Sequence, residues 1–241
     1  PDLPKANARI YEDLLPRHWD QWVKSFSHLF IANYAEKIDT IGQDVMEHQT
    51  YECPLYPFAG NEQINWHPNG NQIAFTAKAM MGRDYALSTN SDIYIYDLLK
   101  NKLINLTEGM LGYDQNPVFS PDGKKIAWES MEREGYESDR IRPFIYDFTK
   151  DTMWEAVMDY ETHATNLKWS TDGNYLHFIS PWHGTQQIYL VDIYQKKPIA
   201  ITSGTHNYND FLISKQGIIG IKQSMSKPDE IYMIDPLNGK E

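Results

Sequence analysis

The sequence predicts an all-β fold: a β-propeller of four-stranded antiparallel blades, of which about four lie in this chain. Three observations predict it. A hairpin motif occurs four times, each copy is followed by a second matching strand, and two copies continue into a matching third segment. Four short strands recurring every ~40–50 residues are typical of propeller blades.

The first part of each repeat is a hairpin whose turn ends in glycine. The copies are "INWHPNGNQIAFTAK", "PVFSPDGKKIAWESM", "LKWSTDGNYLHFISP" and, in degraded form, "FLISKQGIIGIKQSM". Proline presets the backbone angle of the turn, Asp or Asn can hydrogen-bond its own backbone, and glycine accepts the left-handed position. The turn therefore joins the first and second strands of a blade.

The second part of each repeat predicts a buried third strand that ends in aspartate. The copies are "DIYIYD", "RPFIYD", "QIYLVD" and "EIYMID". Strands that are apolar on both faces are expected between neighbouring sheets, and the closing aspartate suits a turn into the next strand. Leu106-Thr107 and Ile201-Thr202 then mark the fourth strand of two blades.

Aligning the ends of the chain with this repeat predicts its organisation. Residues 61–241 hold four blades, the last of them incomplete, and residues 27–60 hold a half blade and a linker. Within that half blade, 27–33 is the expected third strand and 36–42 the fourth. Residues 1–26 form an inter-strand segment with a short helix. The sequence thus opens and closes in the middle of a blade, as a piece of a larger propeller would.

Composition excludes several kinds of function. A net charge of −11 without a basic cluster disfavours nucleic-acid binding. No apolar run is long enough for a membrane helix. The eight histidines lack the spacing of metal ligands and Cys53 is the only cysteine, so we expect no metal and no cofactor.

Two segments outside the repeats resemble a known family. They are "RIYEDLLPRHWDQWVKSFSHLFIAN" and "SMEREGYESDRIRPFIYD", and they are similar to bacterial members of the prolyl-oligopeptidase superfamily, in its dipeptidyl-peptidase and acylaminoacyl-peptidase branch. The resemblance implies a serine peptidase as the parent protein, with the propeller capping an α/β-hydrolase domain and gating short peptides. It also implies a periplasmic or secreted location.

The resemblance leaves the catalytic machinery outside this chain. The sequence has no Gly-x-Ser-x-Gly motif, so we expect the α/β-hydrolase domain to be absent and the chain to be inactive alone. The expected partners are a peptide substrate and that missing domain, and a homo-oligomer is left open. The blade repeats also resemble TolB-like propellers, so a non-catalytic protein-binding propeller is the alternative.

The long connections between second and third strands mark the expected working face, because long loops on one face of a scaffold often carry function. One of them holds the substrate-binding candidates Glu132, Arg133, Glu134, Glu137, Asp139 and Arg140. One or two of these carboxylates would bind the α-amino group of a peptide. The alternatives are a solvated loop, or Arg/Asp pairs that brace it.

A second group of candidates lies near the start of the chain and comprises Arg17, Trp19 and Asp20. We expect a short helix here, because Trp19 and Trp22 are three residues apart and would share one face of it. Burial against the propeller and a place in the substrate chamber are the two interpretations.

Overall fold

The computed structural model describes residues 10–12, 17–18, 20–23, 25–34, 42–56 and 59–241. The regular secondary structure of the described chain is nearly all antiparallel strand. Its helices are the single-turn η1 (Asn61–Gln63) and the short α1 (Gly82–Leu87). The all-β prediction is therefore confirmed.

Four antiparallel sheets follow the four repeats, and within each the strands pair in chain order. The first sheet contains β5 (Ile64–Trp66), β6 (Gln72–Ala77), β7 (Asp92–Asp97) and β8 (Lys102–Asn105). The second contains β9 (Asp114–Phe119), β10 (Lys125–Ser130), β11 (Arg142–Asp147) and β12 (Thr152–Glu155). The third contains β13 (Thr165–Trp169), β14 (Tyr175–Trp182), β15 (Thr185–Asp192) and β16 (Pro198–Ala200). The fourth has three described strands, β17 (Asn207–Ile213), β18 (Ile218–Ser224) and β19 (Lys227–Ile234).

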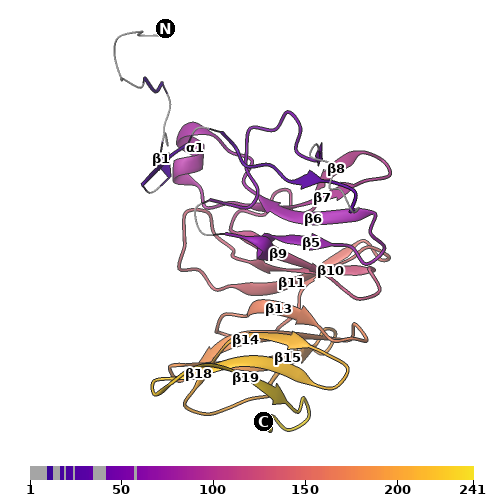
Figure 1. Cartoon of the computed structure of the whole chain (residues 1–241), viewed down its shortest axis with the longest axis vertical. Helices are drawn as coiled ribbons and strands as arrows, with labels where there is room; N and C mark the ends of the chain where they lie inside the picture. The colour runs from indigo at the N-terminus through magenta and orange to yellow at the C-terminus, as the bar shows by residue number, and fades with distance from the viewer. Residues whose placement is uncertain (1–9, 13–16, 19, 24, 35–41, 57–58) are drawn as a thin grey trace.

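The sheets stack on one another in chain order, from the first sheet in magenta to the fourth in yellow (Figure 1). Apolar side chains fill the space between them. Trp128 lies in the cluster between the first and second sheets, Phe178 between the second and third, and Phe211 between the third and fourth. The third strand β7 is buried along its whole length, as its apolar sequence predicts.

The hairpin turns have the predicted chemistry in three of the four repeats. The glycine N–H donates to the carbonyl three residues earlier, for example Gly123 to Ser120 at 2.8 Å. Gly70, Gly123 and Gly173 all have φ near +70°, which L-residues with a side chain rarely adopt. In the degraded fourth copy, Gly217 has φ +149° instead.

The Leu-Thr and Ile-Thr segments shared by two repeats are explained by a buried hydroxyl. Thr107 Oγ1 accepts the Ile93 N–H at 3.0 Å and donates to Asp92 at 3.1 Å. Thr202 does the same in the third sheet, accepting the Ile188 N–H at 2.9 Å and donating to Gln187 at 2.8 Å. The threonine thus ties the segment after the fourth strand to the third strand.

The short helix expected between Arg17 and Trp22 is a wrong prediction. The chain forms a hairpin there, in which β1 (Arg17–His18) pairs with β2 (Gln21–Trp22). The Arg17 guanidinium donates to the Asp20 carbonyl at 2.8 Å and lies 5.0 Å from the Trp22 ring. One turn of helix is marginal without tertiary packing, and these local contacts favour the hairpin.

The segment 27–60, in which we expected a half blade, contains a two-stranded sheet. In it β3 (Phe30–Ile31) pairs with β4 (Gln43–Asp44). The segment 36–42, which we expected to be the fourth strand of this blade, lies outside the described residues, apart from Gly42.

Candidate functional site

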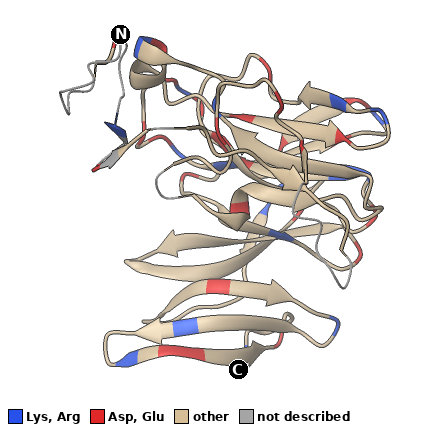
Figure 2. Cartoon of the chain, turned by 45° about the horizontal axis from the view of Figure 1, so that its top comes forward, with Lys and Arg blue, Asp and Glu red and all other residues tan. Residues whose placement is uncertain are grey.

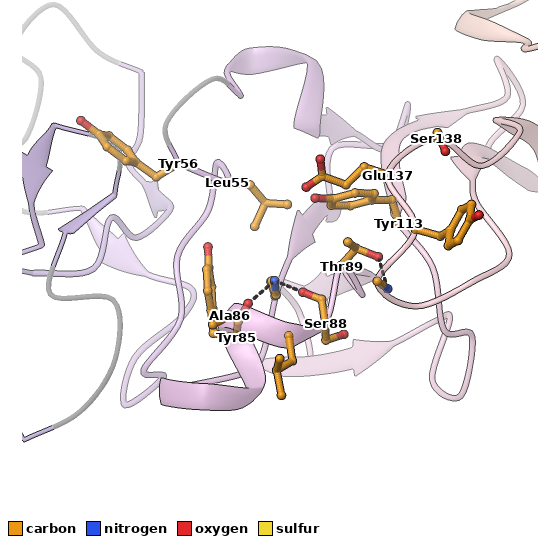
Figure 3. Close-up of a pocket in the computed structure, with 13 residues that line it drawn as sticks. Leu55, Tyr56, Tyr85, Ala86, Ser88, Thr89, Tyr113, Glu137 and Ser138 are labelled. Atoms are coloured by element: carbon orange, nitrogen blue, oxygen red, sulfur yellow. Dashed lines mark hydrogen bonds between the residues drawn. The ribbon is translucent and has the colours of Figure 1, made fainter.

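A cavity of about 690 Å³ opens between the long second-to-third connections of the first and second sheets. One wall comes from α1 and the residues that follow it. The other comes from residues 131–141, which join β10 to β11 and are called here the second-sheet loop. Figure 3 shows the side chains that face the cavity. Both connections belong to the face that the sequence singled out.

Lys78 holds the α1 wall in place. It follows β6 directly, is 8% exposed, and its Nζ donates to the carbonyls of Tyr85 at 2.8 Å and Ser88 at 2.5 Å. A lysine at the carboxyl end of a helix satisfies carbonyls that lack intrahelical partners. Burial lowers the pKa of Lys78, while the negative charges of Glu137 and Glu134 act in the opposite direction.

Asp139 braces the second-sheet loop from within. Its Oδ2 accepts the backbone N–H of Arg133 at 2.8 Å and of Glu132 at 3.3 Å, and its Oδ1 accepts the Arg133 guanidinium at 2.5 and 3.0 Å. The hydrogen bonds from Arg133 hold the pKa of Asp139 down at about 2. Arg133 and Asp139 therefore form an Arg/Asp pair that braces the loop, which is one of the alternatives to amine binding.

Two further candidates are also held by neighbours. Arg140 donates to Glu155 and to the Tyr160 carbonyl, each at 2.8 Å, so it ties the loop to the second sheet and the segment after it. Glu132 lies 3.3 Å from the Arg142 guanidinium.

Glu137 is the candidate that faces the cavity. Within the described part of the chain, neither Glu134 nor Glu137 has a hydrogen bond or an ion pair, and of the two only Glu137 lines the cavity. In Figure 3 its carboxylate lies beside the ring of Tyr113. Burial, and then the charge of Glu137, raise the pKa of Tyr113.

The candidates near the start of the chain are not among the described residues that line this cavity. Arg17 and Asp20 lie on the β1–β2 hairpin with exposed side chains. Trp19 lies outside the described residues. The structure thus brings together the candidates of the second-sheet loop and leaves Arg17 and Asp20 apart from them.

Sequence reasoning singled out the two connections that form the walls, but of the residues that line the cavity it named only Glu137 as a candidate. Tyr56, Tyr85, Tyr113 and Tyr136 line it together with Lys78. The only available signal was the position of Lys78, a charged residue that directly continues an apolar strand. The tyrosines come from four separate segments, so no local pattern relates them.

The brace at Asp139 leads to a prediction that concerns the loop alone. Asp139→Asn removes the charge that holds two backbone N–H groups, so we expect the Glu132 and Arg133 amides to exchange with solvent roughly tenfold faster. Hydrogen exchange measured by mass spectrometry or NMR checks this. Asp159→Asn, at an exposed position of another loop, is the control; equal exchange in both variants and the wild type would contradict the brace.

Lys and Arg are spread along the ribbon among Asp and Glu (Figure 2). No group of three or more His, Cys, Asp or Glu side chains in this part of the chain is placed to hold a metal ion. No described helix has the length and apolar character needed to cross a membrane.

Curated relatives match almost the whole chain. Dipeptidyl-peptidase 5 of Porphyromonas gingivalis is 40% identical over 239 residues, which are 99% of this chain and 35% of that protein. Dipeptidyl-peptidase 5 of Porphyromonas endodontalis is 39% identical over the same shares. The chain is homologous to part of dipeptidyl-peptidase 5. It spans about a third of the length of these relatives, and no family model matches it.

Solved structures share the fold of the chain. Dipeptidyl peptidase 4 of Porphyromonas gingivalis has a TM-score of 0.55 at 16% identity, over 89% of this chain and 36% of that one. Acylaminoacyl peptidase of Pyrococcus horikoshii has 0.54 at 20% identity, over 70% and 25%. A TolB-like protein of Agrobacterium tumefaciens has 0.58 at 17% identity, over 74% and 62%. The predicted resemblance to propellers of dipeptidyl and acylaminoacyl peptidases is confirmed.

Proposed function

We propose that the chain is part of the N-terminal propeller of a dipeptidyl-peptidase, in which it gates and orients short peptides for an α/β-hydrolase domain. The four sheets would be successive blades, and the 27–60 pair would be half of another. Homology to dipeptidyl-peptidase 5 along 99% of the chain supports this function over a TolB-like protein-binding propeller. A Gly-x-Ser-x-Gly motif encoded downstream of the chain would distinguish the two.

The observation that carries the orienting role is the position of Glu137. Its carboxylate faces a cavity large enough for a short peptide, and no described cation pairs with it within ion-pair distance. The other acids of the cluster differ, because Asp139 and Glu132 already contact arginines. In this proposal Glu137 accepts charge-assisted hydrogen bonds from the α-ammonium group of a peptide, which fixes how much of it extends toward the nucleophile.

The tyrosines of the cavity would complete the site. Tyr113 lies beside the Glu137 carboxylate and Tyr85 lies under the Lys78 ammonium, 4.1 Å from Nζ to the ring centroid. Aromatic rings supply apolar contact area together with a polar tip. Such a wall suits the first side chain of a peptide whose amine is held by Glu137.

The test uses the full-length enzyme that contains this chain. Glu137→Gln keeps the shape of the side chain and removes its charge, so we expect kcat/KM for a free-amine dipeptide substrate to fall roughly 10- to 100-fold. The N-acylated counterpart has no ammonium group to lose, so its kcat/KM is expected to stay constant.

Glu134→Gln is the matched control, because Glu134 is on the same loop and does not line the cavity. It should leave both substrates unaffected. An equal change for both substrates in Glu137→Gln would contradict the amine-binding role.

A further inference from the structure

A second cavity, of about 470 Å³, lies along the first strands of the four sheets and is called here the first-strand cavity. These strands are neighbours in space, β5 beside β9, β9 beside β13 and β13 beside β17. The first-strand cavity shares no lining residue with the cavity that Glu137 faces. Five of its thirteen lining residues are asparagines, and each first strand supplies one: Asn65 of β5, Asn116 of β9, Asn166 of β13 and Asn209 of β17, with Asn61 of η1 as the fifth.

Two of these asparagines have the same unusual backbone. Asn116 and Asn166 each lie seven residues before a turn glycine, Gly123 or Gly173, and both have φ +56°. The pairing of each strand with the next one shifts register at this point. Such a bulge changes the direction of a side chain, and asparagine is enriched among residues that accept a left-handed backbone. The second and third sheets therefore present an asparagine to the cavity in the same way.

A carboxylate fixes the amide orientation of both residues. Asn116 Nδ2 donates to Glu129 Oε2 at 3.1 Å, and Asn166 Nδ2 donates to Asp210 Oδ1 at 2.7 Å. Because an ionised carboxylate only accepts hydrogen bonds, the amide must turn its NH₂ group toward it. Within the described chain neither asparagine Oδ1 has a hydrogen bond. Each residue thus offers the cavity an open acceptor.

Asn65 has the opposite orientation. Its Oδ1 accepts the backbone N–H of Phe119 at 3.0 Å, and an N–H can only donate. Asn65 Nδ2 has no hydrogen bond with a described residue. The first-strand cavity therefore has a fixed pattern, with one open donor from the first sheet and an open acceptor from each of the next two.

The rest of the lining limits the kind of ligand. The charged residues have both signs, Lys168 on one side and Glu62 and Glu129 on the other, and both oxygens of Glu129 already accept hydrogen bonds. None of the described lining residues is aromatic, so no ring is available on which a base or a sugar could stack. Val118 and Leu167 add apolar surface. A neutral ligand that both donates and accepts hydrogen bonds fits this lining.

We propose that the first-strand cavity is a second peptide-binding site, which holds the backbone of an extended, uncharged peptide segment through Asn65, Asn116 and Asn166. A peptide backbone carries one N–H donor and one C=O acceptor on each residue, which complements the open donor and acceptors of the cavity. The partners of the asparagines already fix their amides, so binding costs little side-chain freedom. The site needs neither Glu137 nor a free amino terminus, so it is independent of the proposed function.

The test titrates the ¹⁵N-labelled 241-residue chain with acetyl-Ser-Ala-Ser-Ala-Ser-amide and follows binding by NMR. This probe has no α-ammonium group, so it does not report on amine binding at Glu137. We expect the side-chain amide resonance of Asn65 to shift. Asn116→Gly and Asn166→Gly remove an acceptor but tolerate the left-handed backbone, and each should raise the Kd roughly tenfold.

Asn101→Gly is the matched control. Asn101 also has a left-handed backbone, at φ +50°, but it lies between β7 and β8 and does not line the cavity. It should leave the Kd of the wild type unchanged. Equal Kd values for Asn166→Gly and Asn101→Gly, or no shift at Asn65 with millimolar peptide, would overturn the proposal.

A comparison of ligands on the wild type keeps the proposal testable if a glycine variant does not fold. The same peptide with every backbone nitrogen methylated keeps its carbonyls but cannot donate to Asn116 or Asn166, so its Kd should be higher by at least about tenfold. Maltotriose, a neutral sugar with many hydroxyl groups, should leave the Asn65 amide unshifted. Equal binding of the methylated peptide, or the same shifts with maltotriose, would overturn peptide recognition by the cavity.

Discussion

Replacing Trp128 by alanine is expected to lower the free energy of unfolding by about 3–5 kcal/mol. The indole is completely buried between the first and second sheets, and its ring centroid lies 5.9 Å from that of Phe144. Its N–H also donates to Asp114 Oδ1 at 2.9 Å. Alanine would leave a cavity in the seam and remove this hydrogen bond from a buried carboxyl. Urea denaturation measured by circular dichroism checks the loss.

Two variants separate the contributions at Trp128. Trp128→Phe retains most of the apolar volume and removes the N–H, so we expect a smaller loss, about 1–3 kcal/mol. Trp182→Ala removes an indole that is 53% exposed at the β14–β15 hairpin, and should change stability by less than about 1 kcal/mol. Similar losses for Trp128→Ala and Trp182→Ala would mean that the seam does not stabilise the fold.

Thr107→Val is expected to lower the free energy of unfolding by about 1–3 kcal/mol, and so is Thr202→Val. Valine has the shape of threonine but leaves the N–H of Ile93 or Ile188 without its hydroxyl acceptor. The cost arises because a buried donor that has lost its partner keeps the full penalty of desolvation. Chemical denaturation of both variants measures it.

The matched control for these threonines is Thr152→Val. Thr152 begins β12 with an exposed side chain, so valine there should be neutral within about 0.5 kcal/mol. A loss at Thr107 without one at Thr202 would show that the repeated threonine does not have the same role in both sheets.

The strands were predictable because the turns that join them in each repeat are formed by residues close together in the sequence. Gly123 needs a left-handed backbone, and Asp147 accepts the N–H of Thr149 and Lys150 in the turn to the fourth strand. Each of these turns involves residues that are only a few positions apart in the sequence. Sequence patterns report such interactions directly, and the four copies make coincidence improbable.

The prediction of a short helix near the start of the chain was wrong, and it rested on only two residues. Trp19 and Trp22 have helical spacing, but spacing indicates a helix only when a packed face supports it. Arg17 instead contacts Asp20 and Trp22 across a hairpin. Nothing in the sequence of this short segment distinguishes the two outcomes.

The sequence by itself determined the repeat, the order of the strands and the loop on which to look for a site. Only the tertiary structure distinguished the acids of that loop, because Asp139 and Glu132 contact arginines while Glu137 faces the cavity. Only the structure, too, brought Asn65, Asn116 and Asn166 of three sheets to one cavity. An acid in a sequence has the same charge everywhere, and its burial and partners, which set its chemistry, depend on residues from distant strands.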